Sequence, residues 1–401
     1  MDFEYKIVHI IIKLVARSTQ QVRSANMFTL RNSTQHQILN RIWISESFTR
    51  QSLSQELSVN RSTVSRSIEG MIEQNLIVRD GIQNPGETGG RKTEILRLNE
   101  RRVFVLGITL VNDRIFSVIS DFKGTVLKEQ SISKKIDVST IVDEIDETIG
   151  EYGSFFDSLM AIAISMPGII DSEEGIVKYS FDLKIYNLHL REHIEEKWGF
   201  YTFVENDANA GAACYLLKSK MEDSNLIYFM FSFPTEFITY GGIGAGIVIN
   251  NKIYKGSRMS AGEVVLDNSW KASKKFFFHA GDLSGFQYES EDFPKIFREM
   301  VSNLASRIVT VTTLLDPDRI ILGGDINDFS ESVLSVLKKE IMTGLGQSKG
   351  DYSQRAEPEF IIIDTEGLRN IAVGGCLSFL NLFFSDYSKA LDVLNHGNRG
   401  D

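Results

Sequence analysis

The sequence is poor in the residues that form disulfides and zinc sites. Only two cysteines, Cys214 and Cys376, and six histidines occur among 401 residues. A disulfide framework and a cysteine-rich zinc site are therefore excluded, and the two thiols suit a reducing compartment. With 42% hydrophobic residues, the chain is long enough for two or three domains with their own cores.

Long apolar runs are also lacking. Residues 7–15 (IVHIIIKLV) are too few and too interrupted to cross a bilayer, and no small-residue cleavage site follows them. We therefore expect a soluble, cytoplasmic protein with no membrane partner. Apolar residues within 1–30 recur at helical spacing, which predicts an N-terminal helical extension. That extension is either a helix that binds a partner or a leader that precedes a start at Met27.

The two ends of the chain differ in charge. Residues 1–100 contain 13 Lys and Arg against 10 Asp and Glu, which is a net charge of +3. The whole chain has a net charge of −10, so the other residues carry −13. A mildly basic N-terminal part can approach nucleic-acid phosphates, whereas an acidic body repels them. A mixed solvated surface would give the same asymmetry, so the motifs must decide.

One stretch of the acidic part places polar side chains at the end of a predicted strand. Residues 203–212 (FVENDANAGA) run from β-forming residues into small, helix-compatible ones. In an α/β sheet, ligands bind outside the carboxyl ends of strands, where Asn206 and Asp207 could bind the hydroxyls of a polyol. The same residues also suit an ordinary helix start, with Asn206 as N-cap and Asp207 in the first turn.

Three other segments combine a strand with turn residues. They are residues 165–171 (SMPGIID), 239–250 (TYGGIGAGIVIN) and 315–326 (LDPDRIILGGDI). The glycine-rich turn of the second segment would let backbone N–H groups approach an anion. Taken with residues 203–212, they closely resemble the motifs of the ROK family, which includes sugar kinases and sugar-responsive repressors. The resemblance covers residues 33–380 and implies an α/β body of the two-lobe actin/hexokinase-like (ribonuclease H-like) fold, which we expect over residues 99–401.

Residues 31–98 predict a winged helix-turn-helix domain. Amphipathic helices are expected at 38–43, at 50–57 with Thr49 as N-cap, and at 61–75. On the third helix, one stripe is apolar (Val64, Ile68, Met71, Ile72), and the outer, N-terminal side offers hydroxyls and a forked Arg donor. Those are the residue types that a major-groove helix needs.

A hairpin with a basic, glycine-rich tip follows these helices. Strands are expected from Leu76 and from Arg91, with residues 81–90 as the tip, and the GGRK sequence at 89–92 is similar to the wing of ROK repressors. A three-helix bundle without a role in DNA binding is the alternative, which the basic wing disfavours. The predicted DNA contacts are Arg50, Gln51, Arg61, Ser62, Thr63, Ser65, Arg66, Arg91 and Lys92.

The sequence departs from the kinases of the family at the phosphate loop. ROK kinases end the first strand of the body in an Asp-x-Gly-Gly-Thr loop that handles the phosphates and metal of ATP. In residues 107–113 (GITLVND), Thr109 takes the Asp position and the loop glycines are absent. A loop without them cannot bring backbone N–H groups close to a triphosphate.

The zinc motif of the family is also replaced. Relatives carry Gly-Glu-x-Gly-His followed by Cys-x-Cys-Gly-x-x-Gly-Cys. In this chain the His position is Leu266, and the three Cys positions are Phe278, Ala280 and Phe286. None of them supplies a thiolate or an imidazole, so we expect no metal and no cofactor, and we interpret His279 as a surface or packing residue.

The sequence is compatible with two functions. The first is a DNA-binding transcriptional regulator, a repressor of carbohydrate-utilisation genes, whose body senses a sugar or sugar phosphate. It would bind a double-stranded DNA operator as a homodimer or tetramer. The resemblance implies effector contacts at Asn187, Asn206, Asp207 and Glu263.

The second function is an active ROK-type sugar kinase, with Asp207 as general base and ATP as phosphate donor. Loss of the phosphate loop favours the regulator over an enzyme. If the protein is a regulator, four glycines are turn residues retained with the fold: Gly242, Gly244, Gly323 and Gly324. A vestigial pocket, with regulation by another signal, is a third alternative.

Overall fold

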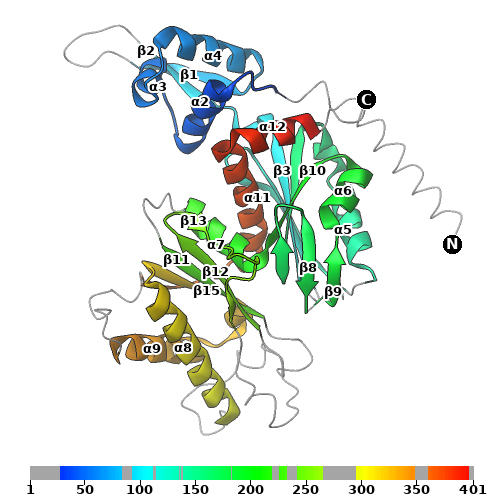
Figure 1. Cartoon of the computed structure of the whole chain (residues 1–401), viewed down its shortest axis with the longest axis vertical. Helices are drawn as coiled ribbons and strands as arrows, with labels where there is room; N and C mark the ends of the chain where they lie inside the picture. The colour runs from blue at the N-terminus through cyan, green and yellow to red at the C-terminus, as the bar shows by residue number, and fades with distance from the viewer. Residues whose placement is uncertain are drawn as a thin grey trace, which may run out of the picture.

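The structure has a small head above a body of two lobes, each built around its own sheet (Figure 1). This computed structural model describes residues 28–83, 93–111, 114–134, 136, 139–181, 183–218, 225–232, 242–264, 295–347 and 360–396. Of the extension expected at residues 1–30, only residues 28–30 are described, and they are not helical. They bury Phe28 and Leu30.

The head consists of three helices and a two-stranded hairpin. Helices α2 (Ser33–Ile44), α3 (Arg50–Glu56) and α4 (Arg61–Glu73) precede the antiparallel strands β1 (Ile77–Gln83) and β2 (Thr93–Leu98). Thr49 caps α3 as predicted, because its hydroxyl accepts from the Ser52 N–H while the Ser52 hydroxyl accepts from the Thr49 N–H. The three helices share a core of Ile38, Leu39, Ile42, Leu53, Val64, Ile68 and Met71.

The first lobe contains a mixed sheet with the strand order β10-β6-β3-β4-β5. Its strands are β3 (Phe104–Val111), β4 (Arg114–Ser120), β5 (Val126–Ser133), β6 (Leu159–Met166) and β10 (Tyr201–Asn206). Strands β3, β4 and β5 are antiparallel neighbours, whereas β6 runs parallel to β3 and to β10. The carboxyl ends of β3, β6 and β10 therefore meet at one edge.

Helices cover both faces of this first sheet. Helices α5 (Ile141–Gly150) and α6 (Leu190–Trp198) pack on one face, against side chains such as Leu106 and Ile108. Helix α11 (Leu368–Ser385) packs on the other face, against Val105 and its neighbours. A small sheet of β7 (Ile169–Asp171), β8 (Ile176–Ser180) and β9 (Ile185–Leu188) extends from the end of β6.

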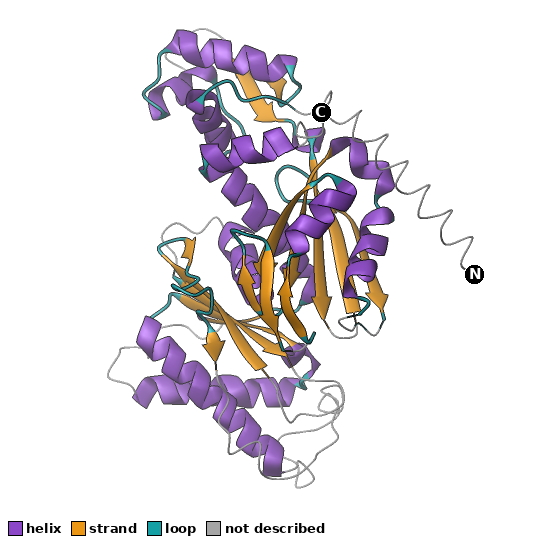
Figure 2. Cartoon of the chain, turned by 45° about the vertical axis from the view of Figure 1, so that its right-hand side comes forward, coloured by secondary structure: helices purple, strands orange, loops and turns teal. Residues whose placement is uncertain are grey.

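The second lobe has the strand order β13-β12-β11-β15-β16, with β14 beside β12. Its strands are β11 (Leu226–Ser232), β12 (Gly242–Ile249), β13 (Lys252–Ile253), β14 (Glu263–Val264), β15 (Arg319–Gly324) and β16 (Ile361–Ile363). The amphipathic helices α8 (Lys295–Leu315) and α9 (Glu331–Gln347) bury their apolar faces on its outer side (Figure 2). Helix α7 (Asp207–Lys218) covers its inner side.

The two lobes meet through helices α7 and α11, which lie between the two sheets. Small residues allow this close approach. A Cβ atom on Gly374 of α11 would lie 1.8 Å from the carbonyl oxygen of Ala210 on α7. A Cβ atom on Gly246 of β12 would likewise lie 2.1 Å from the carbonyl oxygen of Ala208.

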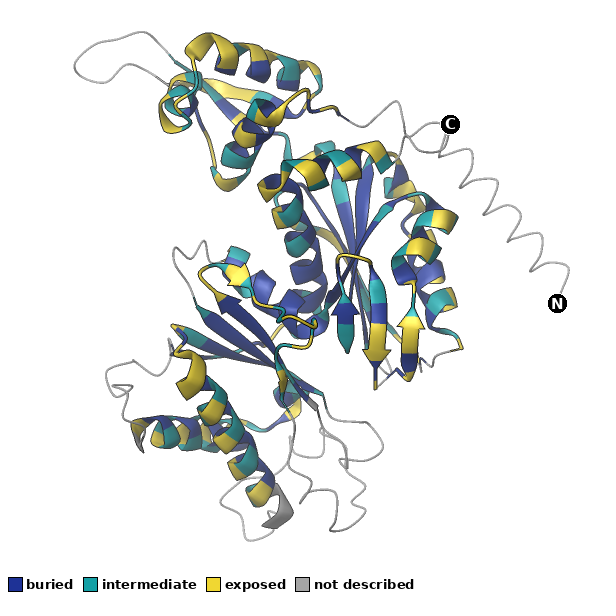
Figure 3. Ribbon diagram, viewed as in Figure 1, coloured by how far each residue is buried: buried dark blue, intermediate teal, exposed yellow. Residues whose placement is uncertain are grey.

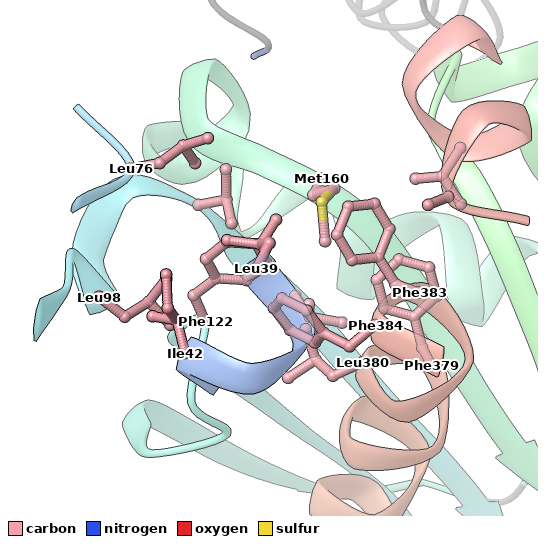
Figure 4. Close-up of a cluster of buried hydrophobic side chains, with 14 of the residues drawn as sticks. Leu39, Ile42, Leu76, Leu98, Phe122, Met160, Phe379, Leu380, Phe383 and Phe384 are labelled. Atoms are coloured by element: carbon pink, nitrogen blue, oxygen red, sulfur yellow. The ribbon is translucent and has the colours of Figure 1, made fainter. Parts of the chain in front are cut away.

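The head packs on the first lobe through a cluster of buried aliphatic and aromatic side chains (Figure 4). Trp43 of α2 stacks on Phe384 of α11, with ring centroids 4.6 Å apart and an interplanar angle of 12°. The Nε2 atom of buried His36 lies 2.8 Å from the carbonyl oxygen of Phe383. Lys123, in the turn between β4 and β5, donates hydrogen bonds to the Trp43 and Ser45 carbonyls at the end of α2.

Helix α11 is the one described helix that is long and apolar enough to cross a membrane by length and composition. It is buried along most of its length between the head, the first sheet and α7 (Figure 3). A further helix, α12 (Tyr387–His396), follows it. The composition of α11 is therefore explained by the core that it occupies.

Candidate functional site

The predicted recognition helix presents its polar residues outward. On α4, Arg61, Ser62, Thr63 and Arg66 are exposed and Ser65 is half-buried, while the opposite side is buried in the head. Gln51 on the neighbouring helix α3 is also exposed. The helix has no acidic residue in its first turn, so its N-terminal N–H groups and Arg61 give that end a positive charge.

The arginines of the head divide into two groups. Arg50 bonds Glu94 on β2 at 2.5 Å and Glu69 on α4 at 2.6 Å, and Arg79 of β1 bonds the same two carboxylates. These pairs connect α3, α4 and the hairpin. By contrast, no ion pair is recorded for Arg61 or Arg66 among the described residues.

The hairpin differs in detail from its expected form. Strand β1 continues through Gly81 to Gln83, so the described part of the wing is longer than expected. Gly81 has a positive φ of 104° at an irregularity in the pairing between Arg79 and Ile82. Arg91 and Lys92, the expected contacts at its tip, lie outside the described residues.

The second candidate site is the turn from β10 into α7. Asn206 ends β10, and its Oδ1 accepts a hydrogen bond of 3.0 Å from the Asn209 N–H, as the N-cap interpretation predicts. Its Nδ2 donates to the carbonyl oxygen of Gly168, which fixes the amide. Asp207 begins α7, is only 6% exposed, and accepts a hydrogen bond from the Ala208 N–H.

Glu205, directly before this turn, has a central place in the structure that no sequence motif predicts. It is only 3% exposed, and its Oε1 accepts hydrogen bonds from the Asn206 N–H and the Asn209 side chain. Its Oε2 lies 2.6 Å from the Lys255 ammonium, which comes from the second lobe. No sequence motif marks Lys255, because the two residues meet only when both lobes are assembled.

The structure brings Glu263 toward the turn but leaves Asn187 apart. Glu263 on β14 is exposed and pairs in register with Gly244 of β12, where a Cβ atom would lie 3.5 Å from that of Ala208. Asn187 on β9 is exposed, has a positive φ of 51°, and its amide lies 3.4 Å from His189 Nε2. No recorded contact among the described residues joins Asn187 to Asp207.

The interpretation of the glycines as turn residues needs correction. Gly244 lies inside strand β12, where a Cβ atom would make only ordinary contacts, whereas the missing Cβ atom of Gly246 in the same strand admits helix α7. Gly323 lies inside β15, where a Cβ atom would clash with the Tyr228 hydroxyl at 2.1 Å. Of the described glycines in question, Gly324 alone has a positive φ, of 77°.

The described part of the expected phosphate-loop segment lies in a strand. Residues 107–111 belong to β3, which pairs with β4 as far as Val111 opposite Arg114. Thr109 is fully buried, and its hydroxyl has no hydrogen-bond partner among the described residues. Asn112 and Asp113, as well as Leu266, Phe278, His279, Ala280 and Phe286 of the replaced zinc motif, lie outside the described residues.

A buried polar network at the lobe junction also escaped sequence reasoning. The fully buried Asp364 carboxylate accepts hydrogen bonds from the Tyr228 hydroxyl and the Asn370 amide, both at 2.7 Å. Asn370 Oδ1 in turn accepts from Lys218 and from the Cys214 thiol. Burial raises the pKa of Cys214 to about 11, and burial together with Asp364 raises the pKa of Tyr228 well above its usual value.

Comparisons with known proteins agree with this architecture. Residues 105–264 match the model of the ROK family. The xylose repressor of Caldicellulosiruptor bescii is 29% identical over 234 residues, which are 57% of this chain and 56% of the repressor. The chain thus spans little more than half the length of that relative.

Two solved structures are similar in fold. A ROK family transcriptional regulator, described as a homologue of the E. coli MLC protein, has a TM-score of 0.66 and 20% identity, covering 91% of this chain and 100% of that one. A ROK family glucokinase from Streptomyces griseus in complex with glucose and AMPPNP has a TM-score of 0.53 and 20% identity, covering 68% and 97%. The fold is therefore the two-lobe actin/hexokinase-like fold, with a helical head added.

Within that class, the family model is more specific: residues 105–264, which include most of the first lobe and part of the second, form a segment that matches the ROK family.

Proposed function

We propose that the protein is a transcriptional regulator that binds operator DNA through its head and a sugar or sugar phosphate through its body. Its similarity to a xylose repressor supports a role as a repressor of carbohydrate-utilisation genes in the cytoplasm. The observation that carries the proposal is an exposed polar face on α4, with Arg61 and Arg66 outside any recorded ion pair, on a chain with a ROK family domain.

The head is proposed to act as a winged helix-turn-helix. The exposed residues near the start of α4 would enter the major groove, with Arg66 as a bidentate donor to a base edge. Ser62, Thr63, Ser65, Arg61 and Gln51 would contact phosphates or base edges, and Arg91 and Lys92 would follow the backbone. Arg50 is already engaged by two carboxylates, so its contribution would be to hold the helix and wing together.

One head offers few contacts, so we propose that two heads of a homodimer or tetramer read a two-fold operator. The body would bind its effector at the β10–α7 turn, with Asp207 and Glu263 as acceptors for sugar hydroxyls. Asn206 contributes mainly as the cap that fixes the turn, and Asn187 would contribute only if a ligand reaches β9.

A sugar kinase is the second candidate, because the fold also resembles a ROK family glucokinase. In that function Asp207 would act as general base and ATP would be the phosphate donor. The burial of Thr109 in strand β3 argues against it, since residues 107–111 offer no loop for phosphates. ATP-dependent phosphorylation of a sugar that disappears in Asp207→Ala would establish the kinase.

The DNA-binding part is tested by selecting binding sites from random duplexes with the full chain. We expect a two-fold motif and a marked loss of affinity with added salt. In a titration with the selected duplex, Arg66→Ala should weaken binding by about 1–3 kcal/mol. The control is Arg114→Ala, an exposed arginine of the body, which should bind as the wild type does. Equal affinities for all three proteins would refute the assignment of α4.

The effector part is tested by adding sugars, beginning with D-xylose, to the protein bound to its selected duplex. We expect a sugar to release the wild type but not Asp207→Ala, whose affinity without sugar should stay within about twofold of the wild type. Asp392→Ala, an exposed acid on α12, serves as control. Normal release of Asp207→Ala would show that the effector does not use this turn.

A further inference from the structure

An ion pair beneath the β10–α7 turn connects the two lobes. Lys255 follows β13 at the edge of the second sheet, and its Nζ lies 2.6 Å from Oε2 of Glu205 on β10 of the first sheet. The Glu205 side chain is 4% exposed and that of Lys255 is 29% exposed. The contact is therefore largely shielded from solvent, unlike a surface pair that salt would screen.

The two oxygens of this carboxylate have different partners. Oε2 faces Lys255 of the second lobe, whereas Oε1 accepts hydrogen bonds from the Asn206 N–H at 2.9 Å and the Asn209 amide at 3.1 Å. Asn206 and Asn209 also bond each other across the first turn of α7. One buried group thus joins the second lobe to the backbone and side chains that position Asp207.

Lys255 is the one cation recorded in an ion pair with Glu205 among the described residues. A buried carboxylate that loses its only counter-charge must either protonate, draw in water or move outward. Each of these changes would alter the hydrogen bonds that Oε1 makes to the turn. The geometry of the turn should therefore depend on whether the second lobe keeps Lys255 in place.

We propose that Glu205 and Lys255 form a positioning pair, through which the second lobe holds the ligand-binding turn of the first lobe. Neither residue needs to touch a ligand for this role. The inference rests on the proposed function in one respect, that the turn binds an effector. If it does, ligand affinity and lobe arrangement are coupled through this contact, and the coupling is reciprocal.

Hydrogen exchange of backbone amides in the full chain tests the pair without ligand or DNA. In Lys255→Met, amides of residues 206–210 and 254–262 should exchange about tenfold faster, as expected when local opening becomes about 1.4 kcal/mol easier. Lys255→Arg keeps the charge and should restore slow exchange in both segments. Lys252→Met removes an exposed lysine of the same hairpin and should leave both segments unchanged.

Two results would overturn the proposal. Exchange in Lys255→Met that equals the wild type would show that the pair holds nothing. Faster exchange confined to residues 254–262 would show that Lys255 holds only its own loop. If Lys255→Met does not fold, the double variant Glu205→Gln/Lys255→Met removes the buried charge with its partner. The proposal then predicts the same faster exchange in both segments, and unchanged exchange would again overturn it.

The exchange experiment tests the Glu205–Lys255 pair independently of the proposed function as a regulator. A wild type that selects no DNA motif would remove the regulator, yet the exchange of residues 206–210 would still show whether Lys255 positions the turn. Conversely, a wild type that binds DNA but shows no effect of Lys255→Met would leave the regulator intact and remove the pair.

Discussion

The head and the second lobe are attached to the first lobe by different kinds of contact. The head is joined mainly by hydrophobic packing: Trp43 stacks on Phe384, which lies among Phe122 and Phe383 of the first lobe. Hydrogen bonds of His36 and Lys123 lie beside this cluster. The second lobe is joined by closely packed small residues on α7 and α11, by the Asp364 network, and by the Glu205–Lys255 pair. Helix α11 takes part in both junctions.

This difference indicates which junction can change its arrangement. Separating the head would expose large aromatic rings to water, at about 25 cal/mol for each Å² of apolar surface. At the lobe junction, polar groups that become exposed when the lobes separate can replace a lost partner with a hydrogen bond to water. We therefore expect the head to move with the first lobe as one body, and an effector signal to travel as a change between the lobes.

The largest expected effect comes from breaking the aromatic junction. Phe384 is fully buried and stacks on Trp43, so Phe384→Ala should lower the free energy of unfolding by about 3–5 kcal/mol. Urea denaturation followed by tryptophan fluorescence measures this loss. Leu314→Ala on α8 is the control, because that side chain is 77% exposed and should change stability by less than about 0.5 kcal/mol. Similar small losses in both variants would mean that the head is only loosely attached.

A smaller effect is expected at the polar lobe junction. Asn370→Ala removes a donor to the buried Asp364 carboxylate and the acceptor for Lys218, which should lower the free energy of unfolding by about 1–3 kcal/mol. Asn381→Ala changes an exposed residue of the same helix and should be nearly neutral. A loss in Asn370→Ala as large as that in Phe384→Ala would contradict the ranking of the two junctions.

The two thiols distinguish local opening from global unfolding in Asn370→Ala. Burial raises the pKa of Cys214 to about 11 and that of Cys376 to about 12, so both should react slowly with a disulfide reagent near pH 8 in the wild type. Cys214 donates to Asn370 across the junction, whereas Cys376 packs against β3. Only Cys214 should become more reactive in Asn370→Ala, and equal acceleration of both thiols would indicate global unfolding instead.

The smallest expected change in stability concerns Asp121. This residue lies in the turn between β4 and β5, whose Lys123 donates hydrogen bonds to the end of α2. Burial is the main cause that raises the pKa of the Asp121 carboxyl above its usual value. The folded state thus binds a proton more readily, so stability falls as pH rises from the usual pKa to the raised one and stays lower above it. Asp121→Asn keeps an acceptor for the Lys123 and Thr125 N–H groups. At neutral pH it should unfold with a free energy higher by less than about 1 kcal/mol, and this gain should vanish in acid. A gain that persists in acid would contradict the assignment.

Much of the fold could be predicted from the sequence, because local patterns decide it. Helix α4 begins at Arg61 as expected and ends at Glu73, close to the expected end at residue 75. Thr49 caps α3, as its position before a helical pattern indicates. These elements depend on apolar period and capping, both of which are visible in a short window.

The lobe junction could not be predicted, since it depends on residues far apart in the chain. Glu205 and Lys255 are 50 positions apart, and Tyr228 and Asp364 are 136 apart. The sequence predicts turns at Gly244 and Gly323, but both residues lie inside strands. The tyrosine ring that packs against Gly323 comes from a distant part of the chain and leaves no local pattern. The local pattern at Asn206 was sufficient, because the side chain caps helix α7 as its position predicts.

The claim that the head moves with the first lobe is tested most directly by pulsed electron paramagnetic resonance, which measures the distance between two spin labels. One pair, Gln55→Cys with Glu196→Cys, joins the head to the first lobe, and the other, Glu196→Cys with Lys339→Cys, joins the first lobe to the second. All three positions are exposed, and the native thiols are buried. We predict a narrow distance distribution between head and first lobe and a broader one between the lobes. A head-to-lobe distribution broader than the lobe-to-lobe one would contradict the claim that the head moves with the first lobe.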